Sequence, residues 1–255
     1  MDFDFALVPS LGQRLEFIRN MGFLRVQRSG RVRRFAVGDD IGAYDDRAQS
    51  AMLIGRTLLG CMAGLSREEK KEIKNSIKIA SLVCDTYENE ALGLGDWLNR
   101  YARMLNHFGW YSDRHPGEKV YRDLSSTVSG KMIETVRQLG NEPMLTNSIA
   151  AFKALESDSR GLAAYAGATL YGKSFQVAPA GRDSKGMLTM ELNHARLIVK
   201  RKTKSFLFVS WQKGEAELQH NYRSFYLDRN AYAETKQKLE DILEESDMAE
   251  IELRL

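Results

Sequence analysis

The chain has 255 residues, of which 43% are hydrophobic and 28% charged, a composition typical of a globular protein with a substantial core. It contains 37 basic and 34 acidic residues, so the net charge of +3 permits an anionic partner without requiring one. The two cysteines, Cys61 and Cys84, exclude a disulfide framework, and no Cys/His cluster has zinc spacing. We therefore expect no metal and no cofactor.

The N-terminus lacks the pattern of a secretory signal, because it starts acidic and no basic region precedes an apolar run. No apolar run reaches the roughly 18 residues that a transmembrane helix needs. We expect synthesis in the cytoplasm and, if the protein is released or secreted, a route independent of a signal peptide.

Residues 1–44 are expected to form an N-terminal unit. A short helix is predicted from Ser10 to Met21, because its apolar residues share one face. A hairpin is predicted between Phe23 and Val37, with its turn at Ser29-Gly30. The remaining residues, 45–255, are expected to form a single α+β domain.

The pattern of residues 45–172 is helical. Ala51–Leu65 is apolar nearly all round, which favours a central core helix; conditional insertion into a membrane is the alternative. Its Gly60-x-x-x-Gly64 spacing is typical of helices that approach closely. The stretch from Gly161 to Gly172 is likewise rich in small residues, Gly and Ala.

The other helices of this region are predicted from their caps and periodicity. Ser66 and Glu69 have the spacing of a capping box, which starts a helix that ends near Tyr87. Asp96 is expected to cap the next helix. Two more are predicted from Val120 to Leu139 and from Asn147 to Leu155.

After Gly172 the sequence favours strands. Short turns predict an antiparallel meander over residues 173–227 and a closing helix over 228–247. Ile251–Leu255 is either one more strand or a loose tail. The fold class is therefore α+β, with a helical N-terminal two-thirds packed on a C-terminal antiparallel β-meander closed by a final helix. The strands are expected at Ser174–Val177, Met187–Leu192, His194–Lys200, Ser205–Trp211 and Ala216–Leu227.

Two basic segments are candidate contacts for an anionic membrane surface. The first, in the predicted hairpin, comprises Arg25, Arg28, Arg31, Arg33 and Arg34. The second, in a turn between strands, comprises Lys200, Arg201, Lys202 and Lys204. The same arginines would neutralise several phosphates of a nucleic acid, although no aromatic RNA-binding motif is visible. The alternative to a binding role is that both segments are solvated turns whose charges prevent edge-to-edge aggregation of the sheet.

No motif of a known enzyme class is present, since the chain lacks G-x-S-x-G, H-E-x-x-H and Walker A patterns. His107 is expected at a helix end, His115 in a turn, His194 in an Asn-His turn and His220 on a strand. A hydrolase with His194 or His220 beside a distant carboxylate remains open, because triads are spatial rather than sequential.

Three stretches together resemble one group of bacterial proteins. They are Leu65–Ser76 with the following helix, the series Trp97-x3-Tyr101-x3-Leu105-x3-Gly109-Trp110, and the meander from Phe175 to Asp228. The resemblance is to the Erwinia virulence factor (Evf) type, and it covers roughly Leu65 to Leu243. It implies a non-enzymatic insect-gut virulence factor with an α/β fold and a fatty acyl chain on a cysteine.

One departure separates this chain from that group. The resemblance places the acylated cysteine late in the chain, and this sequence has no cysteine after Cys84. Acylation would have to use Cys61 or Cys84, and neither position matches. The leading hypothesis is a non-enzymatic, toxin-like or insecticidal virulence protein that acts at a membrane surface, with a nucleic-acid-binding module and a His-based hydrolase as alternatives. The oligomeric state is left open.

Overall fold

The computed structural model describes most of the chain, and every structural statement below refers to these residues. They are 5–21, 48–86, 93–112, 116–122, 124–138, 141–169, 174–199, 206–244, 248 and 250–255. The arginine-rich hairpin expected between Phe23 and Val37 lies outside them.

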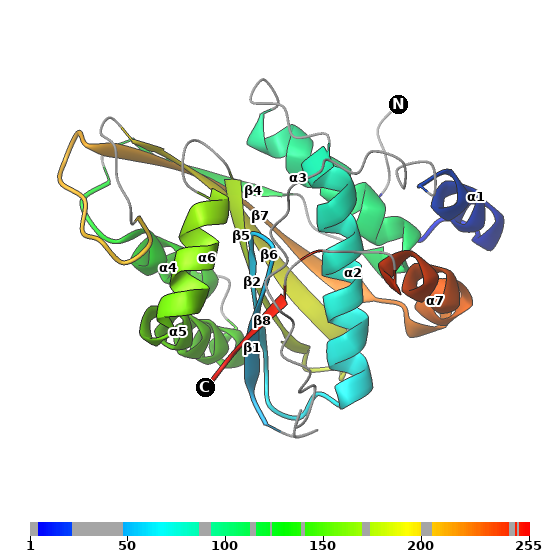
Figure 1. Cartoon of the computed structure of the whole chain (residues 1–255). Coiled ribbons are helices and arrows are strands. Elements are labelled where there is room, and N and C mark those ends of the chain that lie inside the picture. The colour runs from blue at the N-terminus through cyan, green and yellow to red at the C-terminus, as the bar shows by residue number, and fades with distance from the viewer. Residues whose placement is uncertain are drawn as a thin grey trace.

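The described residues form an α+β fold around one mixed sheet (Figure 1). The helices are α1 (Leu11–Met21), α2 (Arg67–Thr86), α3 (Leu94–His107), α4 (Val128–Gln138), α5 (Glu142–Ser157), α6 (Ser159–Thr169) and α7 (Arg229–Glu244). The strands are β1 (Ser50–Ile54), β2 (Thr57–Cys61), β3 (Trp110–Tyr111), β4 (Gly117–Tyr121), β5 (Ser174–Arg182), β6 (Leu188–Val199), β7 (Ala216–Leu227) and β8 (Glu250–Leu253).

The sheet lies between two layers of helices. Its strand order is β3-β7-β6-β5-β2-β1-β8, with β4 also paired to β7. Helices α1, α2, α3 and α7 cover one face, and α4, α5 and α6 cover the other (Figure 1). Each face has its own apolar core, because alternate residues of a strand point to opposite sides. Leu59 belongs to the first core and Leu58 to the second.

The helix predicted over Ala51–Leu65 is wrong, because this segment forms the hairpin of β1 and β2. Gly55, with φ of +55°, and Arg56 make the two-residue turn between the strands. The run is apolar all round because β2 is buried on both faces, between β1 and β5. A strand covered on both sides needs the same composition as a core helix, so periodicity could not separate them.

The sheet is larger than the predicted antiparallel meander. β5, β6 and β7 are antiparallel, as expected, but β5 also pairs in parallel with β2, with Thr57 opposite Gln176. The expected break at Asn193-His194 is wrong, since β6 runs through it without interruption. The expected strand Ser205–Trp211 is also wrong: residues 206–211 belong to no strand, and the Trp211 indole nitrogen donates to the Phe206 carbonyl within the segment.

Three helix starts differ from their predictions. Val120 lies in β4, and the helix expected to begin there starts only at Val128. The N-cap of α3 is Gly93 rather than Asp96, which lies in the first turn. The helix expected over Asn147–Leu155 is part of α5, which begins five residues earlier, at Glu142. The helices α1, α2 and α7 occur where they were expected, and the C-terminal residues 250–253 form strand β8.

Glu69 confirms the predicted capping box and also joins three elements. Its carboxylate accepts from the backbone nitrogen of Ser66 at 2.9 Å and from the Ser66 hydroxyl at 3.1 Å. The same buried carboxylate pairs with Arg182 at the end of β5 and lies 3.6 Å from Arg229 at the start of α7. The start of α2 is therefore tied to the sheet and to the closing helix.

Gly60 lets helix α5 approach strand β2 closely. A Cβ at this position would lie 2.9 Å from Asn147 Nδ2 and 3.4 Å from the Ala151 Cβ. Gly64 has a separate role, because its φ of +88° serves the turn after β2. The Gly60-x-x-x-Gly64 spacing thus reflects strand–helix packing and a turn.

We predict that Gly60→Ala lowers the free energy of unfolding by about 1–3 kcal/mol, because the new methyl group overpacks the contact with α5. Gly167→Ala is the matched control: the glycine is exposed on α6 with open space around it, and alanine there should stabilise the helix by about 0.5–1 kcal/mol. Urea denaturation measures both. A Gly60→Ala protein as stable as wild type would contradict the close packing.

Candidate functional site

The predicted basic contacts lie outside the described residues, but the elements that flank them are described. The arginine segment follows α1 and precedes β1, whose Ser50 pairs with Cys61 at the Arg182 end of the sheet. The lysine segment follows Val199, which lies beyond the Ser174–Arg196 pair at the other end. The described start of β1 and the described end of β6 therefore lie at opposite ends of the sheet.

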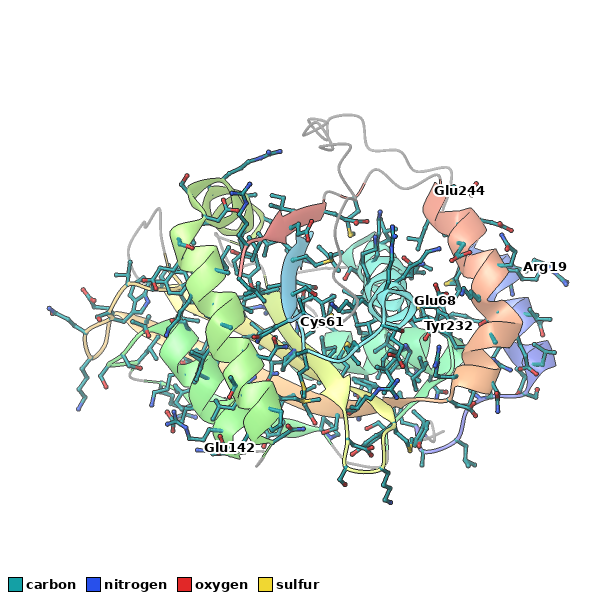
Figure 2. All side chains as sticks on the ribbon, turned by 90° about the horizontal axis from the view of Figure 1, so that it is seen from below. Arg19, Cys61, Glu68, Glu142, Tyr232 and Glu244 are labelled. Carbon is teal, nitrogen blue, oxygen red and sulfur yellow. The ribbon has the colours of Figure 1, made fainter. Side chains whose placement is uncertain are left out.

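Both cysteines are buried in the core that α2 and α3 share with the sheet. Cys61 lies on β2 in the interior (Figure 2), and Cys84 lies on α2. Burial raises the pKa of the Cys61 thiol to about 12. The reactive thiolate is therefore scarce at neutral pH, and neither sulfur is accessible to an acyl donor in the folded chain.

A buried polar cluster crosses the sheet beneath α3. The Thr57 hydroxyl donates to Gln176 Oε1 at 3.0 Å, and Gln176 Nε2 lies 3.0 Å from His194 Nδ1. The Trp97 ring stacks on the His194 ring, with centroids 3.9 Å apart and planes within 4°. Strands β2, β5 and β6 thus hold one imidazole in a fixed orientation under an indole.

Two arginines lie beside this cluster. Arg56 Nη1 donates to the Ser174 carbonyl at 3.1 Å, and Ser174 is directly opposite Arg196 on β6. Burial, followed by the positive charges of Arg56 and Arg196, holds the pKa of His194 well below its usual range. The ring is therefore neutral at physiological pH. We call Arg56, Thr57, Trp97, Gln176, His194 and Arg196 the His194 cluster.

The neutral ring carries its proton on Nε2. An amide NH₂ group donates only, so the Gln176 nitrogen makes Nδ1 the acceptor. His194 Nε2 is fully buried and has no hydrogen-bond acceptor among the residues that the structure describes. An unsatisfied buried donor of this kind costs about 1–3 kcal/mol.

His220 lies on the opposite face of the sheet. Its Nδ1 is 3.3 Å from the Thr135 hydroxyl, and its Nε2 is 3.2 Å from Asn193 Oδ1. Burial lowers the pKa of His220 to about 3. The bonds described for His194 and His220 lead to amide and hydroxyl groups, so neither ring has the carboxylate partner that the hydrolase hypothesis requires.

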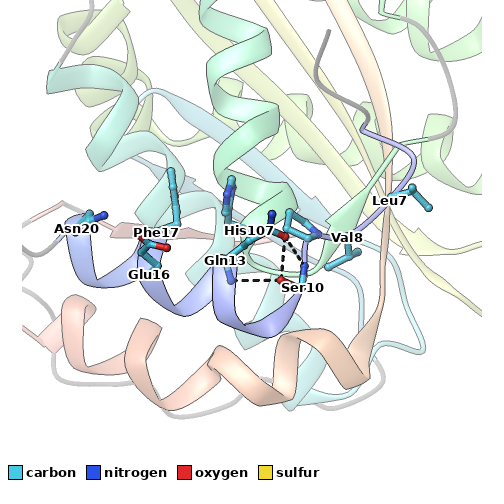
Figure 3. Close-up of a pocket in the computed structure, with 9 residues that line it drawn as sticks. Leu7, Val8, Ser10, Gln13, Glu16, Phe17, Asn20 and His107 are labelled. Carbon is cyan, nitrogen blue, oxygen red and sulfur yellow. Dashed lines mark hydrogen bonds between the residues drawn. The ribbon is translucent and has the colours of Figure 1, made fainter. Parts of the chain in front are cut away.

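An open pocket of about 570 Å³ lies between α1, the residues before it and the end of α3 (Figure 3). Ser10 at its rim donates from both its hydroxyl and its backbone nitrogen to Gln13 Oε1. His107 stacks on Phe17 at 3.8 Å, and its Nδ1 lies 2.7 Å from the Arg103 carbonyl, so this nitrogen donates. Burial lowers the pKa of His107. The polar groups named here bond to other groups of the same helices, and the described lining residues form no nucleophile–base pair.

The remaining sequence predictions have plain outcomes. His115 lies outside the described residues, and His107 lies at the end of α3 as expected. Within the described ranges, no helix is long and apolar enough to cross a membrane, and no group of three or more acidic, histidine or cysteine side chains could hold a metal ion.

The His194 cluster was missed in the sequence because its members are distant along the chain. The sequence pattern places Trp97 in a helical series with Tyr101 and Leu105 and His194 in a turn, so nothing in it brings the two rings together. One signal was available: His194 continues the alternation of Leu188, Met190 and Leu192, which places it on the same inward-facing side of a strand.

Comparison with known proteins gives a distant structural likeness. No family model matches the sequence, and no curated protein matches it. Among solved structures, the chain is similar to the one described as "Structure of the Evf virulence factor", with a TM-score of 0.39 and 11% identity over 91% of this chain and 88% of that chain. A likeness of this size carries no conclusion about activity.

We predict that neither native cysteine reacts with a maleimide at pH 7.5 until the protein unfolds, because both thiols are buried. Ala63→Cys provides the control, since this exposed residue lies two positions after Cys61 and its thiol should be labelled within minutes. Intact mass measures the number of adducts. Rapid labelling of Cys61 or Cys84 in the folded wild-type protein would contradict the burial.

Proposed function

We propose that the protein binds an anionic membrane surface peripherally, through basic side chains and without an inserted apolar segment, as a non-enzymatic virulence or toxin-like protein. The observation that supports this proposal is the clustering of nine basic residues in two short segments: Arg25, Arg28, Arg31, Arg33, Arg34, Lys200, Arg201, Lys202 and Lys204. Basic residues close to an anionic bilayer each contribute about 1 kcal/mol to binding.

The fold bears on how such binding would work. The strongest apolar candidate for insertion, Ala51–Leu65, contributes β1 and β2 to the middle of the sheet, and both cysteines are buried. Insertion of β2 would break its pairing with β5 and expose both cores. Electrostatic attraction is therefore the mode of contact that leaves the fold intact.

The two basic segments should contribute unequally. The arginine segment has five basic residues within ten positions. Its nearest acidic neighbours are Asp39 and Asp40, which follow it in the sequence. We assign the main contact to the arginine segment and a lesser one to the lysine segment.

We predict that Arg31→Glu/Arg33→Glu/Arg34→Glu lowers partitioning onto anionic vesicles by about two orders of magnitude, since three favourable charges are removed. Lys200→Glu/Arg201→Glu/Lys202→Glu should lower it less. Flotation with phosphatidylserine vesicles and with phosphatidylcholine vesicles, at low and moderate salt, measures both. Wild type should float only with the anionic vesicles and should lose binding as salt increases.

Arg137→Glu/Lys153→Glu/Arg160→Glu is the matched control. It changes the net charge equally, and its three residues are exposed on α4, α5 and α6. It should retain most of the binding if position matters more than net charge. The proposal fails if wild type does not float, if the arginine variant floats like wild type, or if the arginines instead support salt-sensitive binding to a DNA duplex alone.

A further inference from the structure

We propose that the His194 cluster is a binding site for a phosphate group, which accepts a hydrogen bond from His194 Nε2 and is balanced by the charges of Arg56 and Arg196. The site is a buried donor without an acceptor, beside two guanidinium groups. It does not depend on the membrane proposal, because it is built from other residues.

The unsatisfied donor is the first part of the argument. Thr57 and Gln176 fix the imidazole so that Nδ1 accepts and Nε2 donates. Nε2 is fully buried, with no acceptor among the described side chains and backbone groups. Buried donors in native proteins are nearly always satisfied, so an acceptor from outside the described chain completes this one.

The direction of Nε2 is the second part. Nδ1 faces Gln176 on β5, so Nε2 lies on the other side of the ring from β5; on the neighbouring strand β7, the register partner of His194 is Asn221. The start of α3 lies above this position, because a Cβ at Gly95 would be 3.9 Å from Asn221 Nδ2. The N-cap of α3, Gly93, offers no side chain to the free N–H groups of the first turn. These groups add partial positive charge near Asn221, on the strand beside His194.

The two arginines make the site selective for negative charge. Arg56 reaches Ser174, which lies directly opposite Arg196, so both guanidinium-bearing residues meet at one cross-strand pair. Arg196 is two residues from His194 on the same face of β6 and is half-buried, so its side chain lies between the buried imidazole and solvent-exposed positions of the strand. Guanidinium groups match the geometry of phosphate oxygens better than other cations.

Trp97 gives the site a spectroscopic reporter. Its ring stacks on His194, so a ligand at Nε2 changes the shielding of the indole. The indole nitrogen of Trp97 is itself buried without an acceptor in the described part of the chain. The Trp97 indole resonance should therefore move when the site is filled, whereas the indole of Trp110, which donates to Ser76, should stay in place.

The test is an NMR titration of the ¹⁵N-labelled full chain with sodium phosphate at pH 7, with sodium chloride holding the ionic strength constant. We expect saturable shifts of the Trp97 indole and of His194 Nε2, with Nε2 protonated at the start. Trp97→Phe assigns the indole peak. Arg196→Gln should weaken the apparent affinity about tenfold, and Arg160→Gln, at an exposed site on α6, should leave it unchanged.

A second arm uses a short-chain phosphatidic acid below its micelle concentration, to separate a lipid headgroup from free phosphate. Saturation by either ligand, with the Arg196 dependence, supports the site and identifies the source. His194→Gln should abolish the Trp97 shift; if this variant does not fold, the wild-type imidazole resonances give the same information. The proposal is overturned if neither ligand saturates, if sodium chloride alone reproduces the shifts, or if Arg196→Gln binds as wild type does.

Discussion

The parallel pairing of β2 with β5 is the constraint on which the rest of the structure depends. It joins residues 57–61 to residues 176–180, more than a hundred positions apart. It therefore unites the β1–β2 hairpin with the antiparallel strands β5, β6 and β7. Leu58 and Leu59 then face opposite cores, and each buried side chain of this size contributes about 1.5–3 kcal/mol. The intervening helices complete the fold by covering the two faces that this pairing creates.

That pairing also limits what the chain can do. The most apolar segment and Cys61 are used inside the sheet, and Cys84 is a buried residue of α2. The two proposals rest on charge instead: on the two basic segments and on the arginines beside His194. Both proposals therefore concern anions, one on a surface and the other a single group in a partly buried site.

Local signals in the sequence predicted local structure well. The capping box of Ser66 and Glu69 and the apolar periodicity of α7 each depend on residues within one helix. The alternation and turns of the C-terminal part indicated β7 for the same reason. These features needed no knowledge of distant partners.

The predictions that failed depend on distant partners. Ala51–Leu65 reads equally as a core helix or a strand buried on both faces, and only its pairing with β5 decides between them. Residues 206–211 have the composition of a strand, but Trp211 and Phe206 are buried in the second core without joining the sheet. The orientation of His194 depends on its hydrogen bond with Gln176 and its stacking on Trp97, and both partners lie on other elements.

The most direct test of this account is hydrogen–deuterium exchange of the β1–β2 hairpin, with and without anionic vesicles. If the hairpin stays in the sheet while charge alone holds the protein at the membrane, the amides of residues 57–61 remain protected in both states, and exchange changes only in the basic segments. Increased exchange of residues 57–61 on vesicles would mean that β2 leaves β5, and it would contradict the central claim.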